Sequence, residues 1–305
     1  MKVLVTGIAG FIGSKLARSL IDKGYEVVGI DDYSTGFKKN VPTESIMIEG
    51  DVSDPSTINK ISQYNFDYIF HFAGQSSGEI SFEDPVKDLK INTSSTLLLL
   101  DFAAKNNIKR FFYASSMSVY GDKKEYVDEN SETDPKSFYG VGKLASEKYL
   151  SIYSSKNLKC TSLRLFNVYG DNQNLSNLKQ GMISIYLSMA IKNGKIQVKG
   201  SKDRFRDFIE INDVIKAIHL LINANQKKSY ETYNISTGNK TKVEKVIKLI
   251  LQYLNSNIDV SYSGTTPGDQ FGIYGDNKKI KMLGWSPSIK FEIGLKNLVL
   301  KHRNA

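Results

Sequence analysis

Short apolar runs alternate with longer amphipathic segments over the first half of the chain. Runs of roughly four to eight residues rich in valine and isoleucine are typical of buried strands, and apolar residues that recur every three or four positions are typical of helices. The strands predicted in this way are Lys2–Thr6, Glu26–Ile30, Ser45–Glu49, Asp67–Phe72, Ile108–Ala114 and Lys159–Phe166. The predicted helices are Ser14–Lys23, Pro55–Tyr64, Pro85–Asn106 and Ser137–Ser155. Strands separated by helices and short turns predict an α/β fold with a doubly wound parallel sheet.

The alternation stops after Gly170. A polar stretch, residues 171–180, is followed mainly by helical patterns and by one short predicted strand, Lys195–Lys199. The predicted helices of this region are Met182–Asn193, Ile211–Asn223, Val243–Tyr253, Asn277–Leu283 and Phe291–Lys301. This pattern indicates a smaller, mixed α/β lobe in the C-terminal part of the chain.

A glycine-rich turn joins the first predicted strand to the first predicted helix, with the spacing Gly7-x-x-Gly10-x-x-Gly13. Glycines at such a turn let a pyrophosphate approach the backbone, and the N–H groups at the start of the helix attract its charge. The second strand ends in Asp31 and Asp32, 18 residues after the last glycine. Asp31 is placed to accept hydrogen bonds from ribose hydroxyls, and two carboxylates would repel a 2′-phosphate. The sequence therefore predicts an NAD site and disfavours NADP.

The segment from Tyr113 to Lys143 carries the candidate catalytic chemistry. A predicted strand runs into Ser115 and Ser116, and Tyr139 and Lys143 lie four residues apart in a predicted helix. Residues four apart share one face of a helix, so the phenol and the ammonium can point into the same space. A neighbouring ammonium favours the phenolate, so we expect the pKa of Tyr139 to lie below its reference value of about 10. Such a tyrosine can serve as a proton-transfer base at neutral pH.

Composition narrows the classes of function. The hydrophobic share of 40% and the charged share of 24% are those of an ordinary globular protein. The net charge of +9 comes from scattered lysines, with no basic block interleaved with aromatic residues, so we expect no nucleic-acid partner. No apolar run reaches 18 residues, so we expect no membrane association. His71, His219 and His302 lack metal-ligand spacing, and we therefore expect no metal site.

The cysteine content and the N-terminus bear on location. Cys160 is the only cysteine, so an internal disulfide and a thiolate metal cluster are excluded. The chain begins directly with a strand-like run and lacks the pattern of a secretory signal. We therefore expect a cytoplasmic protein.

Together these motifs resemble those of the extended short-chain dehydrogenase/reductase family, in particular its NAD-dependent sugar-nucleotide epimerases and dehydratases, with UDP-hexose 4-epimerases as the nearest group. The motifs that carry the resemblance are Thr6-Gly7-x-x-Gly10-Phe11-Ile12-Gly13, Asp31-Asp32, Gly50-Asp51-Val52, His71-Phe72-Ala73-Gly74-Gln75, Ser115-Ser116-x-x-Val119-Tyr120-Gly121, Tyr139-x-x-x-Lys143, Arg164-x-Phe166-Asn167-Val168-Tyr169-Gly170, Arg206-Asp207-Phe208 and Pro267-Gly268-Asp269. The resemblance covers essentially the whole chain. It implies a Rossmann-like NAD-binding domain in residues 1–168 with about 205–237, and a substrate-binding lobe in residues 169–204 and 238–305.

The resemblance also implies a role for particular residues. Tyr139 would exchange a proton with a sugar hydroxyl while NAD takes a hydride from the same carbon, Lys143 would hold the nicotinamide ribose, and Ser116 would bind the reacting oxygen. The implied cofactor-binding residues are Gly7, Gly10, Phe11, Ile12, Asp31, Asp32, Asp51, Val52, Phe72, Ala73, Gly74, Gln75, Asn92, Tyr139 and Lys143. The implied substrate-binding residues are Ser77, Ser116, Asn167, Lys199, Arg206 and Asp269. The implied substrate is a nucleotide-diphosphate sugar, with UDP the favoured nucleotide. Arg206 suits a contact with the diphosphate because its planar fork binds oxygens in pairs.

The two residues after Ser116 narrow the reaction. Dehydratases of this family carry an acidic pair, or at least a glutamate, there, because eliminating water needs an acid and a base. Here these residues are Met117 and Ser118, which do not titrate near neutrality. A 4-epimerase is therefore the favoured function, with transient oxidation at C4, rotation of the 4-keto sugar and return of the hydride. Another sugar-nucleotide epimerase or a ketosugar reductase remains an alternative, and a 4,6-dehydratase or a non-catalytic NAD-binding protein is disfavoured.

Two departures from the family pattern leave the sugar and the nucleotide open. Thr266 stands where many UDP-galactose 4-epimerases have an arginine before the Pro-Gly-Asp triplet. Ile273 falls where residue size gates N-acetylated sugars in that family, and its intermediate size does not decide whether the sugar is N-acetylated.

The segment from Thr96 to Ala104 lacks a polar side, which predicts cover from a partner subunit and hence a homodimer.

Overall fold

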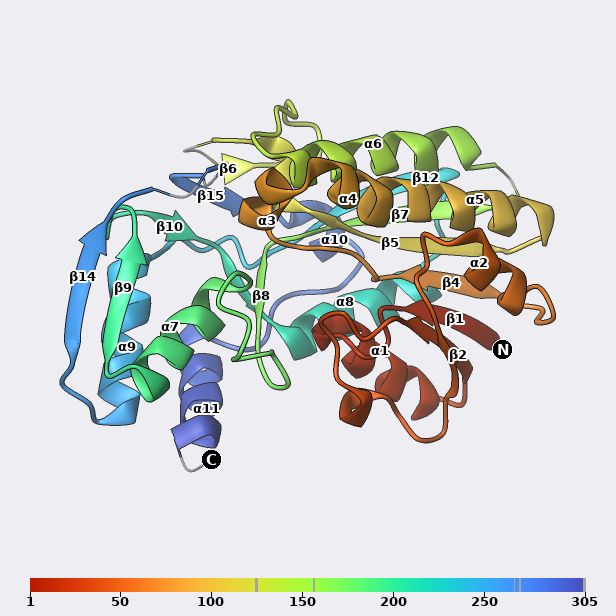
Figure 1. Ribbon diagram of the computed structural model, residues 1–305. Coiled ribbons are helices and arrows are strands. Elements are labelled where there is room, and N and C mark those ends of the chain that lie inside the picture. The colour runs from red at the N-terminus through yellow and green to blue at the C-terminus, as the bar shows by residue number, and fades with distance from the viewer. Residues whose placement is uncertain (124–125, 156, 266, 269, 304–305) are drawn as a thin grey trace.

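The computed structural model describes residues 1–123, 126–155, 157–265, 267–268 and 270–303. A seven-stranded parallel sheet with the order β12-β7-β5-β4-β1-β2-β3 forms its centre (Figure 1). The strands of this sheet are β1 Lys2–Thr6, β2 Glu26–Asp31, β3 Ile46–Glu49, β4 Tyr68–His71, β5 Arg110–Ser116, β7 Lys159–Leu165 and β12 Tyr230–Ile235. The prediction of a doubly wound parallel sheet is confirmed.

The order of the strands places a cleft at the centre of the sheet. From β1 the chain first builds β2 and β3 on one side, and then β4, β5, β7 and β12 on the other. Loops that leave the carboxyl ends of β1 and β4 therefore diverge, and this switch point is where doubly wound sheets bind ligands.

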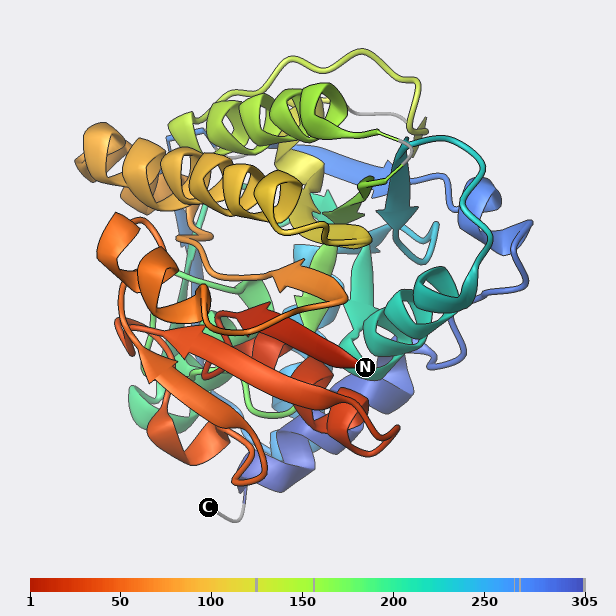
Figure 2. The same ribbon diagram turned by 90° about the vertical axis from the view of Figure 1, so that its right-hand side faces the viewer.

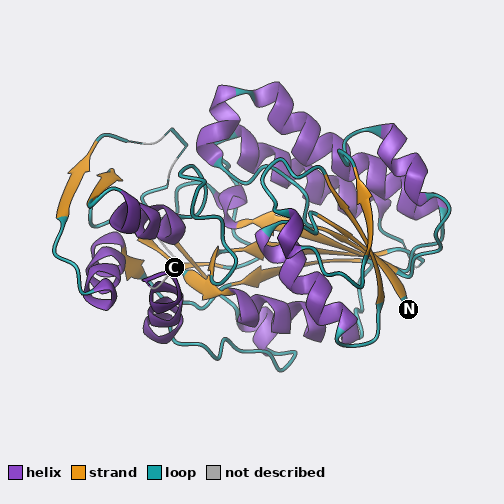
Figure 3. Cartoon of the chain, turned by 60° about the horizontal axis from the view of Figure 1, so that its bottom comes forward, coloured by secondary structure: helices purple, strands orange, loops and turns teal. Residues whose placement is uncertain are grey.

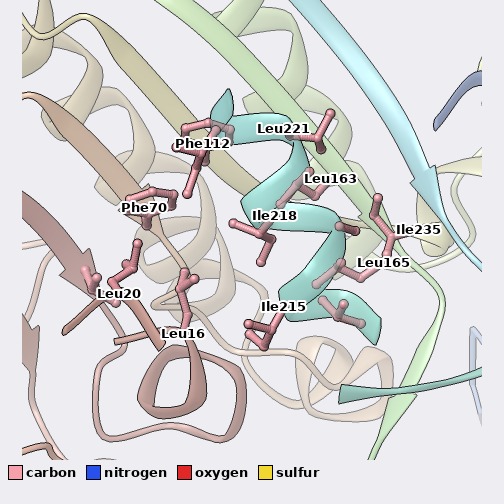
Figure 4. Packing of buried hydrophobic residues seen from close by; sticks show 14 of the residues in the cluster. Leu16, Leu20, Phe70, Phe112, Leu163, Leu165, Ile215, Ile218, Leu221 and Ile235 are labelled. Atoms are coloured by element: carbon pink, nitrogen blue, oxygen red, sulfur yellow. The ribbon is translucent and has the colours of Figure 1, made fainter. Parts of the chain in front are cut away.

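Helices cover both faces of the sheet (Figure 2). Along β1, Val3 and Val5 point to one face and Leu4 points to the other, as the period of two in a strand requires. The first face packs against α1 Phe11–Ile21 and α8 Ile211–Asn223, as Figure 4 shows for Leu16, Leu20 and the α8 side chains Ile215, Ile218 and Leu221. The second face packs against α2 Pro55–Ile61, α5 Ser95–Lys105 and α6 Phe138–Tyr153.

Two elements of this domain differ from the sequence prediction. The seventh strand, β12, was missed because its sequence YETYNI is mostly polar. The predicted helix Pro85–Asn106 is divided into α4 Pro85–Leu89, a π-helical segment Lys90–Ser94 and α5. Single π turns inside helices occur frequently at functional sites.

The C-terminal part forms a second lobe with its own hydrophobic core. The apolar side chains of α7 Met182–Lys192, α9 Val243–Leu254 and α11 Phe291–Arg303 pack together beside the β9–β14 pair (Figure 3). The remaining elements are α3 Gly78–Glu83, β6 Tyr126–Val127, β8 Asn167–Tyr169, β9 Lys195–Lys199, β10 Phe205–Arg206, β11 Phe208–Glu210, β13 Thr241–Lys242, β14 Asp259–Ser263, β15 Gly272–Gly275, α10 Lys278–Lys281 and two short 3-10 helices, Lys38–Asn40 and Met117–Tyr120. Within the described residues, every helix is too short or too polar to cross a membrane.

Candidate active site

The glycine-rich turn after β1 is shaped for close approach of a ligand to the backbone. Gly7 has a φ of 73°, and a Cβ atom there would lie 2.7 Å from the backbone nitrogen of Ala73. A Cβ atom on Gly13 would lie 2.0 Å from the carbonyl oxygen of Gly7, so α1 packs against the turn only with glycine at this position. The first turn of α1 has no side-chain cap at Gly10. Its N–H groups and the positive end of the helix dipole are therefore available to a phosphate group.

Asp31 fixes the turn against the end of β2. Its Oδ2 accepts a hydrogen bond from the N–H of Ala9, and its Oδ1 accepts one from Tyr33, both at 2.9 Å. The side chain is 8% exposed, and burial raises the pKa of Asp31 above its ordinary value. Asp32 accepts from Ser34 at 2.9 Å. Each carboxylate retains acceptor capacity that a ribose diol can use.

One cavity of about 730 Å³ joins this turn to the catalytic candidates. The predicted site residues that line it are Gly7, Gly10, Phe11, Ile12, Asp31, Asp32, Asp51, Val52, Phe72, Ala73, Gly74, Gln75, Ser116, Tyr139, Lys143 and Asn167. Asn92 lies directly behind Gly74, since its Oδ1 is 2.6 Å from the position of a Cβ atom on that glycine. This oxygen is buried and accepts no hydrogen bond. The residues that line this cavity therefore fit a dinucleotide, whose ribose hydroxyls can donate hydrogen bonds.

The catalytic candidates meet where β5 ends. Ser116 caps the short 3-10 helix, its Oγ accepts from the N–H of Ser118 at 3.1 Å, and its hydroxyl lowers the pKa of Tyr139. Ser137 caps the N-terminus of α6 by accepting from Gly140, which fixes the helix that carries Tyr139 and Lys143. The Lys143 Nζ lies 5.6 Å from the centre of the Tyr139 ring. The predicted juxtaposition of Ser116, Tyr139 and Lys143 is therefore present.

The prediction that the pKa of Tyr139 lies below its reference value is wrong for the protein chain without a bound ligand. Burial raises the pKa of Tyr139 to about 12, against a smaller lowering by its hydrogen bond to Ser116. Burial also lowers the pKa of Lys143 to about 8. Burial disfavours the charged form of each group and is the largest cause of both shifts.

A buried ion pair that the sequence analysis missed anchors the catalytic helix. Arg164 of β7 donates to Glu147 of α6 at 2.7 and 2.9 Å, and the Ser115 hydroxyl donates to the same carboxylate at 2.5 Å. These bonds hold the end of β5 against α6. Glu147 lies four residues after Lys143, so its position on the same helix face was the available signal.

The side chains of Met117 and Ser118 line the cavity beside Ser116. The Met117 sulfur accepts a hydrogen bond from the Asn167 amide at 3.4 Å. The positions at which the family's dehydratases carry acids therefore present a thioether and a hydroxyl here.

Two predicted substrate-binding residues have other partners in the structure. Ser77 is buried and caps α3, because its Oγ accepts from the N–H of Ile80 at 3.3 Å, and it does not line the cavity. The Lys199 ammonium lies 2.6 Å from a carboxylate oxygen of Glu79 and forms an ion pair between the second lobe and α3. The substrate contacts predicted for Ser77 and Lys199 stay predictions, and in this structure a helix cap and an ion pair engage the two side chains.

Arg206 also differs from its predicted environment. It is 2% exposed and donates to the carbonyl oxygens of Phe205 at 2.7 Å, Gln270 at 2.6 Å and Phe271 at 3.2 Å. Burial lowers the pKa of Arg206 to about 10. It lies outside the residues that line the cavity.

Three further expectations concern the same region. Ile273 is fully buried in a cluster with Val119, Tyr120 and Phe166 and does not line the cavity. The sugar-gating position inferred for Ile273 stays a prediction. Asp269 and Thr266 lie outside the described residues.

Comparison with known proteins adds to this geometry. The sequence profile of the NAD dependent epimerase/dehydratase family matches residues 3–236. A protein of Methanocaldococcus jannaschii with the provisional name UDP-glucose 4-epimerase is 33% identical over 99% of both chains. The crystal structure of the UDP-glucose 4-epimerase of Thermotoga maritima with UDP-glucose matches with a TM-score of 0.94 and 32% identity, over 100% of this chain and 99% of that one. The UDP-glucose 4-epimerase of Thermus thermophilus in complex with NAD matches with a TM-score of 0.92 and 29% identity, over 100% and 99% of the two chains.

Proposed function

The chain belongs to the NAD dependent epimerase/dehydratase family, and on that premise we propose that it is an NAD-dependent sugar-nucleotide 4-epimerase that acts on a UDP-hexose. The observation that carries the proposal is the shared cavity. It joins a dinucleotide cradle to Ser116, Tyr139 and Lys143, and beside them it presents Met117 and Ser118. A reversible oxidation needs the dinucleotide cradle together with Ser116, Tyr139 and Lys143. A dehydration also needs an acid and a base, and at the two positions after Ser116 this chain has Met117 and Ser118 instead.

The catalytic residues act on one hydroxyl group. When bound, oxidised NAD supplies a hydride acceptor with a positively charged ring. A substrate hydroxyl that reaches Ser116 and Tyr139 passes its proton to Tyr139 as the hydride leaves the same carbon. Because burial raises the pKa of Tyr139 to about 12, its phenolate needs a cation nearby. Lys143 provides that cation, since its pKa of about 8 leaves it mostly protonated at neutral pH.

The cofactor-binding residues hold the dinucleotide at several points. The turn from Gly7 to Gly13 and the start of α1 receive the pyrophosphate, Asp31 and Asp32 accept from the adenosine ribose, and Asp51 and Val52 flank the adenine. Phe72 to Gln75 and Asn92 lie along the nicotinamide half. Gly74 supports this arrangement because it lines the cavity directly in front of Asn92.

The substrate is held between the lobes. Asn167 lines the cavity and supports a contact with the diphosphate. In the structure, Arg206 donates to the carbonyl oxygen of Gln270, and Lys199 pairs with Glu79. Both side chains must leave these partners to bind the diphosphate. We place cofactor binding in residues 1–168 with about 205–237, and substrate binding in residues 169–204 and 238–305. The single cysteine favours a cytoplasmic location.

The proposal includes a homodimer, but on a different surface from the one first expected. The segment Thr96–Ala104 is largely buried or half-buried by its own chain. Instead, α4 and α6 expose Val86 at 77%, Leu89 at 58%, Val141 at 53% and Ile152 at 76%. The two helices lie side by side (Figure 1), and a second copy would cover this apolar surface.

Incubation with UDP-, GDP-, CDP- and dTDP-sugars tests the function. We expect the anomeric proton signals of UDP-glucose and UDP-galactose to interconvert without added cofactor, because an epimerase regenerates its NAD in each turnover. A ketosugar reductase would instead consume added NADH, and a non-catalytic protein would leave every sugar unchanged. Tyr139→Phe is the control for contaminating activity.

A further inference from the structure

Asp88 is a buried carboxylate that the proposed mechanism does not use. It lies on α4 and is 2% exposed. Its Oδ1 accepts from the Gln75 amide at 2.8 Å and from the Asn92 amide at 3.0 Å. Its Oδ2 is buried and has no hydrogen-bond partner. A carboxylate in such a place is costly unless a positive charge lies near it.

Asp88 and Asn92 lie four residues apart on one helical run, so they share a face on which their side chains hydrogen-bond. The Ser146 hydroxyl of α6 donates to the Asn92 carbonyl oxygen at 3.1 Å and holds this side against α6. The unpaired Oδ2 of Asp88 lies 3.7 Å from the position of a Cβ atom on Gly142, the residue before Lys143.

Few charged groups face Asp88. From α6 these are Lys143 and Tyr139. The charge of Lys143 lowers the pKa of Asp88, and Asp88 raises the pKa of Tyr139. The loop after β4 contributes the neutral Gln75, and β5 contributes Tyr113, whose ring lies 4.8 Å below the Lys143 Nζ. On its own helical run, Lys87 and Lys90 are exposed.

We propose that Asp88 is a positioning residue of the catalytic group, and that its carboxylate is the countercharge that keeps the Lys143 amine protonated in a buried site. The inference rests on the proposed function. Burial lowers the pKa of Lys143, and Asp88 opposes that shift. The same carboxylate raises the pKa of Tyr139. Asp88 therefore retains the cation that Tyr139 needs, at the cost of making the phenolate harder to form.

Neutral variants at this position test the proposal. Asp88→Asn keeps a hydrogen-bond acceptor, Asp88→Ser removes most of the side chain, and both remove the charge. Because the Asp88 carboxylate favours the charged amine, we expect Lys143 to titrate at a lower pH in both variants. The titration is followed by the ¹³Cε signal of ¹³C-labelled lysine, assigned by its loss in Lys143→Met. The alkaline limb of the pH–rate profile should move in the same direction, and Asp88→Glu should restore it.

The controls separate this role from a structural one. Asp101→Asn removes an exposed carboxylate of α5 and should leave the Lys143 titration unchanged. An unchanged Lys143 titration in both neutral variants, or a loss of activity equal at every pH and accompanied by a lower Tm, would overturn the proposal. If one variant does not fold, the other and Asp88→Glu still decide. Because the titration needs no substrate, its result is independent of the proposed reaction, which fails separately if the wild-type protein converts no sugar.

Discussion

The cofactor side and the substrate side of the cavity are built in different ways. The cofactor side uses the backbone: a turn that closes on Gly7, the uncapped start of α1, and Asp31 tied to two N–H groups. The proposed substrate side relies on long charged side chains that already have partners, as in the Lys199–Glu79 ion pair. A backbone site is formed before its ligand arrives, whereas the charged side chains must exchange partners when theirs binds.

The two sides also differ in their coupling to the rest of the fold. The cradle is continuous with β1 and β2 in the centre of the sheet. On the other side, two ion pairs join α3 to the second lobe, Lys199–Glu79 at 2.6 Å and Lys179–Glu83 at 2.5 Å. Exposed ion pairs contribute little to stability, about 0–1 kcal/mol, so they can be exchanged for a ligand at small cost. Substitutions on the two sides should therefore change different properties of the protein, and by different amounts.

The largest effect should come from the catalytic group, where the two sides meet. Tyr139→Phe removes the phenol that exchanges the proton, and we expect kcat to fall by at least ~10²-fold, the scale of a lost general acid–base group. Because Tyr139 is 8% exposed and phenylalanine has the same ring, Tm and bound NAD should not change. Turnover is measured by sugar NMR. Near-normal turnover would remove Tyr139 from the mechanism.

Next in size is a change on the cofactor side. Asp31→Ala removes the acceptor for Ala9 and Tyr33 as well as the ribose contact. Hydrogen bonds to a charged group contribute about 1.5–3 kcal/mol, so we expect NAD affinity to fall by roughly 10- to 100-fold. Discrimination against NADP should fall as well.

Titration calorimetry with NAD and NADP measures both effects. Asp31→Asn is the matched control, since it keeps an acceptor and removes the charge. It should relax discrimination with a smaller loss of NAD affinity. Unchanged affinity for both cofactors in Asp31→Ala would contradict the placement of the ribose.

On the substrate side, Arg206→Lys should raise KM for the UDP-sugar by roughly tenfold. A lysine lacks the planar fork that can bind two oxygens at once. The affinity for NAD should not change, because Arg206 lies outside the cavity that the cofactor residues line. A lower Tm with an unchanged KM would show that Arg206 only braces the carbonyl oxygens of Gln270 and Phe271.

The same contrast explains what could be predicted from the sequence. Gly7, Asp31, Tyr139 and Lys143 were found because short spacings along a strand, a turn or a helix determine where they point. The capping role of Ser77 was missed because nothing in the sequence separates a cavity hydroxyl from the cap of α3. For long side chains such as Lys199, the partner comes from a distant segment and depends on the tertiary fold.

Two further misses have physical causes of the same kind. Asp88 was missed because its burial depends on packing against α6, where its Oδ2 lies near Gly142. The strand β12 was missed because its buried Asn234 is satisfied by tertiary partners, the Tyr120 hydroxyl and the carbonyl oxygens of Val127 and Asp276. Neither the surroundings of Asp88 nor the partners of Asn234 can be recognised in a local sequence pattern.

The smallest effect concerns the ion pair between the lobes. Glu79→Gln removes the partner of Lys199, which then faces an anionic substrate without a competing carboxylate. We expect KM for the UDP-sugar to fall about two- to threefold at low salt, the scale of an exposed pair, and to return to the wild-type value at high salt. Glu83→Gln is the matched control, because it breaks the neighbouring pair with Lys179, which is not a predicted substrate residue. If both variants lower KM equally, the pairs act by holding the lobes together, and Lys199 is no substrate ligand. If only Glu79→Gln does so, Lys199 exchanges a carboxylate for a phosphate, which is the behaviour that distinguishes the substrate side from the preformed cradle.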